Sequence, residues 1–206
     1  MKIVELFASI EGEGVLAGRS SFFIRLFGCN LRCKWCDTKF SYDPKTVCED
    51  LSIDEIVNGA AAVNTEIITV TGGEPFTNSD LALLCDKLLT LDRTIKIETN
   101  GTLWLDISDK VYLAVSPKPP HFTITKEAAD RANELKFVVD LDLAIEHLLN
   151  DDFLAIYDRN IPLTLQIESS DAECSLKKAL KLQKELLTHN IKSRIAPQLH
   201  KLLSLP

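Results

Sequence analysis

The 206-residue chain lacks any apolar run close to the roughly 20 residues that a membrane-spanning helix needs. Its first residues, 1–5, also lack the apolar stretch of a secretory signal. No internal repeat and no low-complexity linker divides the sequence. We therefore expect a cytoplasmic protein that folds as one domain over residues 1–206 and has no membrane partner.

The chain is also short of positive charge, with 23 Lys and Arg residues against 30 Asp and Glu residues and a net charge of −7. Nucleic-acid binding relies largely on lysine and arginine side chains that displace counterions from phosphates. The composition therefore argues against a broad nucleic-acid-binding surface. Local basic residues remain compatible with a small substrate, including an anionic one.

A disulfide framework is not expected, although the chain has six cysteines. A chain of this length with 46% hydrophobic residues can bury a sufficient core without covalent crosslinks, and nothing indicates secretion. Cys48, Cys85 and Cys174 have no partner spacing, and Cys85 lies in an apolar helical pattern. We interpret these three as ordinary core or surface cysteines.

The other three cysteines are clustered. Cys29, Cys33 and Cys36 lie within eight residues, directly after the apolar segment 22–27. A loop that leaves a strand can wrap three thiolates around one iron–sulfur cluster, because each Cys binds a separate iron. Clusters that only carry electrons usually have four protein thiolates, so a local set of three leaves one iron open for a ligand that is not protein.

Zinc is the main alternative for these thiols, and incidental cysteines are another. A structural zinc site is commonly four-coordinate and needs a further ligand, but the loop contains no His. The four histidines are remote from the loop: His121, His147, His189 and His200. A solvated or hydrogen-bonded role is the simplest interpretation for them, with His200 set apart by its place in the C-terminal tail.

The pattern of apolar residues predicts strands alternating with helices. We expect strands at 2–8, 21–26, 66–71, 94–98, 111–115, 134–140, 163–167 and 192–196, and helices at about 53–63, 79–91, 141–150 and 174–189. Ser52 and Glu55 have the spacing of a capping box, and Asn78 or Ser79 is expected to cap the second helix. Residues 40–50 are polar and irregular.

This alternation favours a parallel α/β sheet with right-handed crossovers. Polar motifs with Gly or Pro follow several predicted strands, where such folds place their ligand sites. The chain is shorter than the roughly 250 residues of a full eight-stranded barrel. We therefore predict an α/β fold, a partial, open parallel β/α barrel reduced in helices.

Two further features point to a ligand. Glycines alternate with carboxylates in Ile10-Glu11-Gly12-Glu13-Gly14, which is typical of a surface turn or of a close backbone approach to a ligand. Arg25 interrupts the apolar strand 21–26, and a charge at such a position needs a partner or a ligand.

The cysteine spacing, with Trp35 just before the last thiol, resembles the cluster motif of the radical S-adenosylmethionine (SAM) superfamily. In that superfamily three thiolates hold a [4Fe–4S] cluster, and SAM chelates the fourth iron. The segment Thr71-Gly72-Gly73-Glu74-Pro75 resembles the superfamily's glycine motif. The resemblance implies a fold of the radical SAM type.

More of the chain resembles one member family, the 7-carboxy-7-deazaguanine synthases of queuosine and deazapurine biosynthesis. The matching segments run in the family's order from near the first residue to the last. They are 10–14, 23–31, 36–38, 71–75, Glu98-Thr99-Asn100-Gly101-Thr102, Ser116-Pro117-Lys118 and His200-Lys201-Leu202-Leu203-Ser204-Leu205-Pro206.

The resemblance implies a role for each matching position. Substrate contacts would come from Ile10, Glu11, Gly12, Arg25, Thr71 and the free carboxylate of Pro206. SAM contacts would come from Trp35, Cys36, Asp37, Gly73, Ser116, Pro117, Lys118 and Gln166. Cys29, Cys33 and Cys36 would hold the [4Fe–4S] cluster, and Thr38 would ligate Mg²⁺. No catalytic residue is implied beyond the cluster and SAM.

Two positions depart from the family pattern. Many members have Gln where this chain has Glu11, and the pair Gln166-Ile167 lacks a proline often found after that glutamine. The first change is harmless if the Glu11 backbone makes the substrate contact, whereas a contact by the Glu11 side chain would change the charge at the substrate. The second leaves the SAM contacts near Gln166 open.

The implied enzyme is a radical SAM carbon–nitrogen lyase that needs Mg²⁺. It would contract the ring of 6-carboxy-5,6,7,8-tetrahydropterin to give 7-carboxy-7-deazaguanine and ammonia. The implied partners are a flavodoxin or ferredoxin-like electron donor and a second copy in a homodimer. A glycyl-radical-enzyme activating protein and a non-catalytic iron–sulfur redox module are the alternatives.

Overall fold

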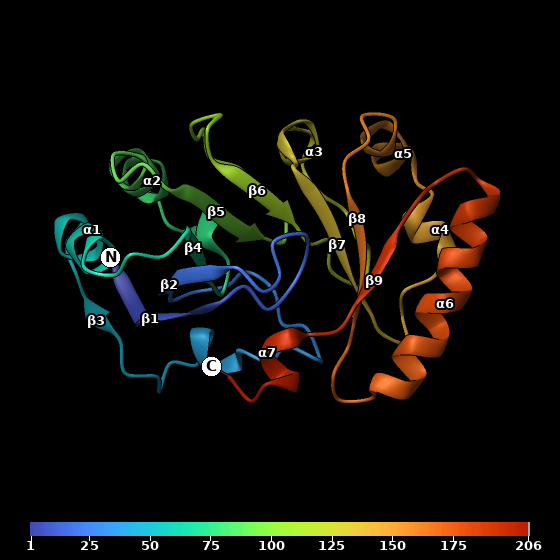
Figure 1. Cartoon of the computed structure of the whole chain (residues 1–206), viewed down its shortest axis with the longest axis horizontal. Helices are drawn as coiled ribbons and strands as arrows, with labels where there is room; N and C mark the ends of the chain where they lie inside the picture. Colours follow the sequence, from blue (N-terminus) through green and yellow to red (C-terminus); the bar gives the residue numbers. More distant parts are fainter. Residues whose placement is uncertain (206) are drawn as a thin grey trace. The chain divides into compact units, whose positions relative to one another are not determined.

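The structure is a computed structural model that describes residues 1–205 (Figure 1). The chain divides into two compact units. Unit 1 comprises residues 1–10, 19–99 and 103–113, and unit 2 comprises residues 11–18, 100–102 and 114–206. The expected single domain over residues 1–206 stays a prediction.

Unit 1 contains five strands in the order β3-β1-β2-β4-β5. They are β1 (Lys2–Ile10), β2 (Ser20–Leu26), β3 (Glu49–Asp50), β4 (Ile67–Gly72) and β5 (Thr94–Thr99). Strands β2, β4 and β5 are parallel, as predicted, whereas β1 is antiparallel to both β2 and β3. The sheet is mixed because the turn-forming residues 11–19 return the chain directly beside β1.

The two faces of this sheet differ in polarity because side chains alternate along each strand. One face carries the fully buried Ile24, Ile68, Val70, Ile95 and Ile97. The opposite face carries Ser21, Arg25, Thr69, Thr71 and Lys96 at the intervening positions. A polar face within a parallel sheet indicates a ligand-binding side.

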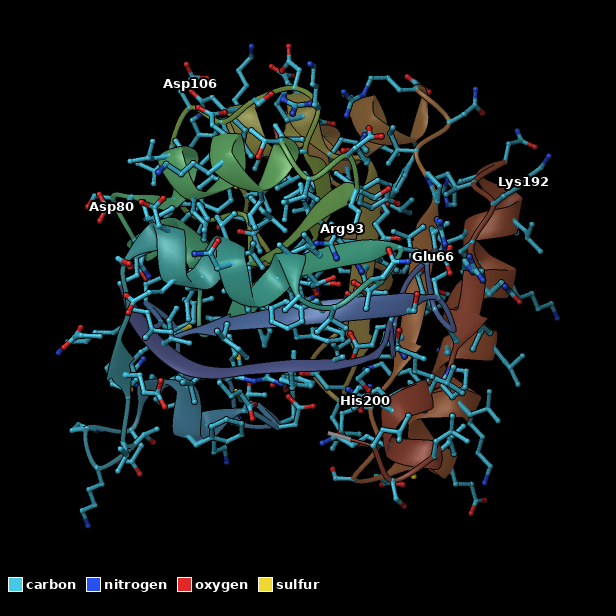
Figure 2. The ribbon with its side chains drawn as sticks, turned by 60° about the vertical axis from the view of Figure 1, so that its left-hand side comes forward. Glu66, Asp80, Arg93, Asp106, Lys192 and His200 are labelled. Carbon is cyan, nitrogen blue, oxygen red and sulfur yellow. The ribbon has the colours of Figure 1, made fainter. Side chains whose placement is uncertain are left out.

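Helices α1 (Ile53–Ala61) and α2 (Leu81–Leu89) belong to this unit and pack against each other (Figure 1). The predicted capping box of α1 is present, with Ser52 and Glu55 bonded reciprocally. Arg93 donates to the carbonyls of Ala60 at 2.7 Å and Val63 at 2.6 Å, which satisfies the end of the same helix (Figure 2).

The expected cap of α2 was wrong. The N-cap of α2 is Asp80, which makes no side-chain capping bond. Asn78 instead ends the 3₁₀ turn η2 (Pro75–Thr77), so α2 begins later than predicted. The stretch expected to be irregular contains the 3₁₀ turn η1 (Lys39–Tyr42) and β3. Cys85 is buried within α2, and burial raises the pKa of its thiol to about 12, as expected of a core residue.

Unit 2 contains parallel strands in the order β6-β7-β8-β9. They are β6 (Tyr112–Val115), which begins at the boundary of the units, β7 (Glu134–Val139), β8 (Leu163–Ile167) and β9 (Arg194–Ala196). The long helix α6 (Ala172–Thr188) lies along β8 and β9 (Figure 1). Its buried Ala179, Leu182 and Leu186 form the face that meets the sheet.

The helix expected at 141–150 was wrong. Only α4 (Ile145–Leu148) lies within that range, so the helix there is shorter than predicted. A second short helix, α5 (Asp151–Tyr157), begins just after it, where the Asn150 side chain accepts a bond from the Phe153 N–H. The sequence reasoning also missed α3 (Lys126–Arg131) and α7 (Leu199–Leu202). Among residues 1–205, no helix is both long enough and apolar enough to cross a membrane.

Candidate active site

The three clustered thiols lie in the loop that follows β2 and precedes η1. All three are partly exposed. The Leu31 N–H donates to Cys29 Sγ at 3.4 Å, and the Cys36 N–H donates to the Cys33 carbonyl at 3.2 Å. Short-range bonds thus turn the loop back on itself and keep the three cysteines in one compact segment.

The glycine motif lies directly against this loop. The Glu74 N–H donates to the Gly28 carbonyl at 2.8 Å, and the Gly73 N–H donates to the Leu26 carbonyl at 3.2 Å. A Cβ atom on Gly73 would lie 1.9 Å from the Gly28 oxygen and 2.8 Å from Cys29 Cβ. Position 73 therefore has no room for a side chain, which explains the glycine without reference to a ligand.

The electrostatics of Cys29 show which groups surround it. Burial raises the pKa of its thiol, and the negative charges of Glu74 and Cys36 raise it further. The Leu31 N–H and the cation of Arg32 lower the same pKa. Arg32 also lies over the Tyr42 ring, with 4.2 Å from its guanidinium carbon to the ring centre. Metal binding would deprotonate these thiols.

Among residues 1–205, no three His, Cys, Asp or Glu side chains converge on a point that would hold a single metal ion. A four-iron cluster does not require such convergence, because each thiolate binds a different iron. The donor set of three neighbouring thiols beside a glycine with no room for Cβ fits a cluster. Cys29, Cys33 and Cys36 are therefore the residues that would hold one.

Thr38, the predicted magnesium ligand, is the N-cap of η1. Its carbonyl accepts bonds from the Ser41 N–H at 2.8 Å and the Ser41 hydroxyl at 2.7 Å. Its own hydroxyl lies 3.7 Å from Cys36 Sγ. Thr38 is thus fixed beside the last thiol of the cluster loop.

Arg25 lies on the polar face of the unit 1 sheet, in register with Thr71 on β4. Its Nε donates to Glu5 Oε1 at 2.5 Å, and only 12% of its side chain is exposed. The guanidinium carbon lies 5.4 Å from the ring centre of Phe7 and 5.6 Å from that of Phe40. Two predicted substrate residues therefore lie on neighbouring strands, and Arg25 is held from three sides.

Sequence reasoning missed Glu5, Phe7 and Phe40, which surround Arg25. It also missed the buried ion pair of Lys96 with Glu98, where Nζ and Oε1 are 2.7 Å apart and Lys96 is fully buried. The alternation Thr-Ile-Lys-Ile-Glu-Thr in β5 was a usable signal. Lys96 and Glu98 lie two positions apart and therefore share one face of β5. This is the face of the sheet that also carries Arg25 and Thr71.

In unit 2 the predicted substrate segment is buried at Glu11 and Gly12. The Glu11 carbonyl accepts a bond from the Gly18 N–H at 2.8 Å, and the Glu11 residue is only 2% exposed. The remaining predicted residue of this segment, Ile10, ends β1 in unit 1.

The C-terminal tail contacts this segment directly. The Leu199 N–H donates to the Gly12 carbonyl at 2.8 Å. His200, on α7, lies so close to Gly12 that a Cβ there would be 2.0 Å from its Nδ1 atom (Figure 2). The predicted contact of the Pro206 carboxylate with the substrate stays a prediction, because Pro206 lies outside the described residues.

The predicted SAM residues of unit 2 lie directly after β6 and within β8. Ser116 is buried, and its hydroxyl accepts a bond from Lys118 Nζ at 2.5 Å. Gln166 is fully buried on β8, and its Nε2 donates to the Ala196 carbonyl at 2.9 Å. Its Oε1 is buried without a hydrogen-bond partner in the described part of the chain, so it is available to a donor from a ligand.

Comparisons with known proteins agree with this geometry. The family model of the radical SAM superfamily matches residues 23–169. A 7-carboxy-7-deazaguanine synthase of Aquifex aeolicus is 38% identical over 208 residues, which covers 98% of this chain and 92% of the relative. A 7-carboxy-7-deazaguanine synthase of Rickettsia prowazekii is 32% identical and covers 81% of this chain and 72% of the relative.

The crystal structure of QueE from Escherichia coli resembles this chain with a TM-score of 0.75 and 27% identity. The match covers 97% of this chain and 94% of that chain. The likeness therefore extends well beyond the cluster loop and includes both compact units.

These matches cover the thiol loop, the glycine motif and the polar sheet face, so the chain belongs to the radical SAM superfamily. It is an enzyme of that superfamily, whose members use a [4Fe–4S] cluster and SAM. Within the superfamily, the chain belongs to the 7-carboxy-7-deazaguanine synthase family. The predicted fold class and family resemblance are confirmed.

Proposed function

We propose that this chain is a 7-carboxy-7-deazaguanine synthase that acts on 6-carboxy-5,6,7,8-tetrahydropterin. The reaction contracts the pterin ring and releases ammonia, which makes the enzyme a carbon–nitrogen lyase. The observation that carries the proposal is the similarity to the Aquifex aeolicus synthase over 98% of this chain. A glycyl-radical activating protein or a redox module would not account for a match of that extent.

Arg25 supports the substrate class. The bond from its Nε to Glu5 and the contacts with the Phe7 and Phe40 rings restrict the orientation of the guanidinium. A guanidinium restricted in this way suits bidentate, charge-assisted bonds to a carboxylate. We assign the pterin carboxylate to Arg25 and a further substrate contact to Thr71, its register partner.

The cluster and SAM, when bound, supply the one-electron chemistry. Cys29, Cys33 and Cys36 would hold the cluster. Trp35, Asp37 and the backbone of Gly73 would line SAM, together with Ser116, Pro117, Lys118 and Gln166. The unpartnered Oε1 of Gln166 supports its part in this set, because a buried acceptor without a donor is costly unless a ligand provides one.

The hydroxyl of Thr38 would ligate Mg²⁺, since magnesium prefers oxygen ligands and keeps substrate oxygens in its shell. The ion would orient the substrate carboxylate and stabilise negative charge. The backbone of Ile10, Glu11 and Gly12 and the carboxylate of Pro206 would bind the remaining polar edge of the pterin.

Other parts of the proposal rest on the sequence or on the family resemblance. These are a cytoplasmic location, a homodimer, an electron donor of the flavodoxin or ferredoxin type, and a product destined for queuosine or another deazapurine.

Substrate binding tests the role of Arg25. Reconstituted protein with SAM should bind 6-carboxytetrahydropterin at least about tenfold more tightly than tetrahydropterin without the carboxyl group, as measured by anaerobic calorimetry. Arg25→Lys should remove most of this preference, because Lys lacks the bidentate fork. Equal affinities for the two pterins in the wild type would reject the carboxylate assignment.

A further inference from the structure

The carboxylate of Glu13 connects three segments of unit 2 that are far apart in the sequence. Its Oε1 accepts a hydrogen bond from Gln198 Nε2 at 2.6 Å, just before α7. Its Oε2 pairs with Lys136 Nζ on β7 at 2.7 Å. Only 5% of the Lys136 side chain and 20% of the Glu13 side chain are exposed, so this ion pair is largely shielded from solvent.

The neighbouring residues fasten the same segment, 11–18, to the same two elements. Glu134, two positions before Lys136 on β7, accepts the Val15 N–H at 2.7 Å. Gly14 adopts a φ of +69°, and a Cβ there would lie 2.4 Å from Glu134 Oε1. A Cβ on Gly12 would likewise overlap the His200 side chain, 2.0 Å from its Nδ1 atom. The alternation of glycine and carboxylate thus lets β7 and the tail approach the segment from two sides.

We propose that Glu13, held by Lys136 and Gln198, is a positioning residue that fixes the 11–18 segment and the C-terminal tail in the arrangement that binds the substrate. The inference rests on the proposed function, which assigns substrate contacts to the Gly12 backbone and to the tail. Glu13 acts through these neighbours, because it follows Gly12 directly and bonds to the residue before Leu199.

A shielded ion pair is well suited to such a role. Replacing a buried ion pair by apolar residues of similar volume often leaves stability unchanged, so a shielded pair is weak evidence for a role in stability. An apolar contact would tolerate sliding of the tail, whereas two directed bonds to one carboxylate define a single position. Removing only one partner would take away the ion-pair partner of the remaining shielded charge, which is destabilising.

The first experiment needs no substrate. Hydrogen exchange at the Leu199 amide should be about tenfold faster in Lys136→Met and Glu13→Gln than in the wild type, because the side chain at position 13 that binds Gln198 is no longer anchored to β7 by the Lys136 cation. Lys177→Met is the matched control, since Lys177 forms an exposed ion pair with Glu173 on α6 of the same unit. Unchanged protection of Leu199 in both test variants would overturn the proposal.

The second experiment separates positioning from a general loss of structure. With reconstituted protein, Lys136→Met should raise the Kd for 6-carboxytetrahydropterin by about tenfold or more and leave the Kd for SAM within about twofold. Lys136→Arg should restore much of the affinity, because it restores the charge. The double variant with Glu13→Gln should bind more tightly than Lys136→Met alone, because a neutral amide does not require the Lys136 cation.

Faster exchange at Leu199 with unchanged pterin affinity would show a purely structural network and overturn the proposal. A wild-type protein that does not bind the pterin would instead overturn the proposed function, while the exchange result would still test the network. If Lys136→Met does not fold, Gln198→Ala at the half-exposed end of the network gives the same two readouts. If Gln198→Ala raised the Kd for 6-carboxytetrahydropterin no more than the control Lys177→Met does, the proposal would also be contradicted.

Discussion

Individual residues explain why the cluster loop has its conformation. Gly73 leaves room for the Gly28 carbonyl and for Cys29, whereas a side chain at this position would overlap both. Gly72 is similarly confined, since a Cβ there would lie 2.1 Å from the Leu26 oxygen. The glycine motif is therefore required by packing against the cysteine loop before any SAM contact is considered.

Gly73→Ala should displace the cysteine loop. The overlap with Gly28 predicts a loss of about 1–3 kcal/mol in the free energy of unfolding, which urea titration measures. Anaerobically reconstituted protein should also hold less iron and bind SAM more weakly than the wild type.

Gly59→Ala is the matched control for this change. A Cβ at Gly59, inside α1, would lie at an ordinary 3.5 Å from Leu6 Cδ1, so we expect unchanged iron content and a gain of up to about 1 kcal/mol. Full iron content in Gly73→Ala would contradict the packing argument.

At the scale of the elements, capping bonds determine where helices begin. Ser52 and Glu55 form the reciprocal bonds that start α1, and their spacing predicted this correctly. Ser79 has an equally good cap residue type, but η2 occupies the preceding residues and α2 begins after Asp80 without a side-chain cap. Residue type alone does not distinguish these two cases.

The two serines therefore give a direct test. Ser52→Ala should lower the free energy of unfolding by about 1 kcal/mol, because the N-terminal amides of α1 lose their acceptor. Ser79→Ala should change it by less than about 0.5 kcal/mol, as expected of a surface position without a capping bond. Equal losses in urea unfolding would contradict the assigned helix starts.

At the scale of the whole molecule, the sequence predicted most strands and the order of its motifs. Short runs of apolar, aromatic and β-branched residues were reliable where the strand is largely buried, as in β2, β4 and β5. The antiparallel direction of β1 and the division into α4 and α5 were missed, because both depend on which segments meet and not on local pattern.

The candidate site was predictable to a similar extent. The thiols, Gly73, Arg25 and Thr71 were found from motifs, and the structure places Arg25 beside Thr71 and Gly73 beside Cys29. The partners of these residues were not found. Glu5 lies 20 positions from Arg25, and their pairing follows from the register of β1 with β2, which no local pattern encodes.

Turnover tests the central claim most directly. Full-length protein, reconstituted anaerobically with iron and sulfide, is incubated with SAM, Mg²⁺, a reductant and 6-carboxytetrahydropterin, and the products are identified by mass spectrometry. The account predicts 7-carboxy-7-deazaguanine and ammonia in equal amounts. An intact four-iron cluster that cleaves SAM without forming the deazaguanine would contradict it.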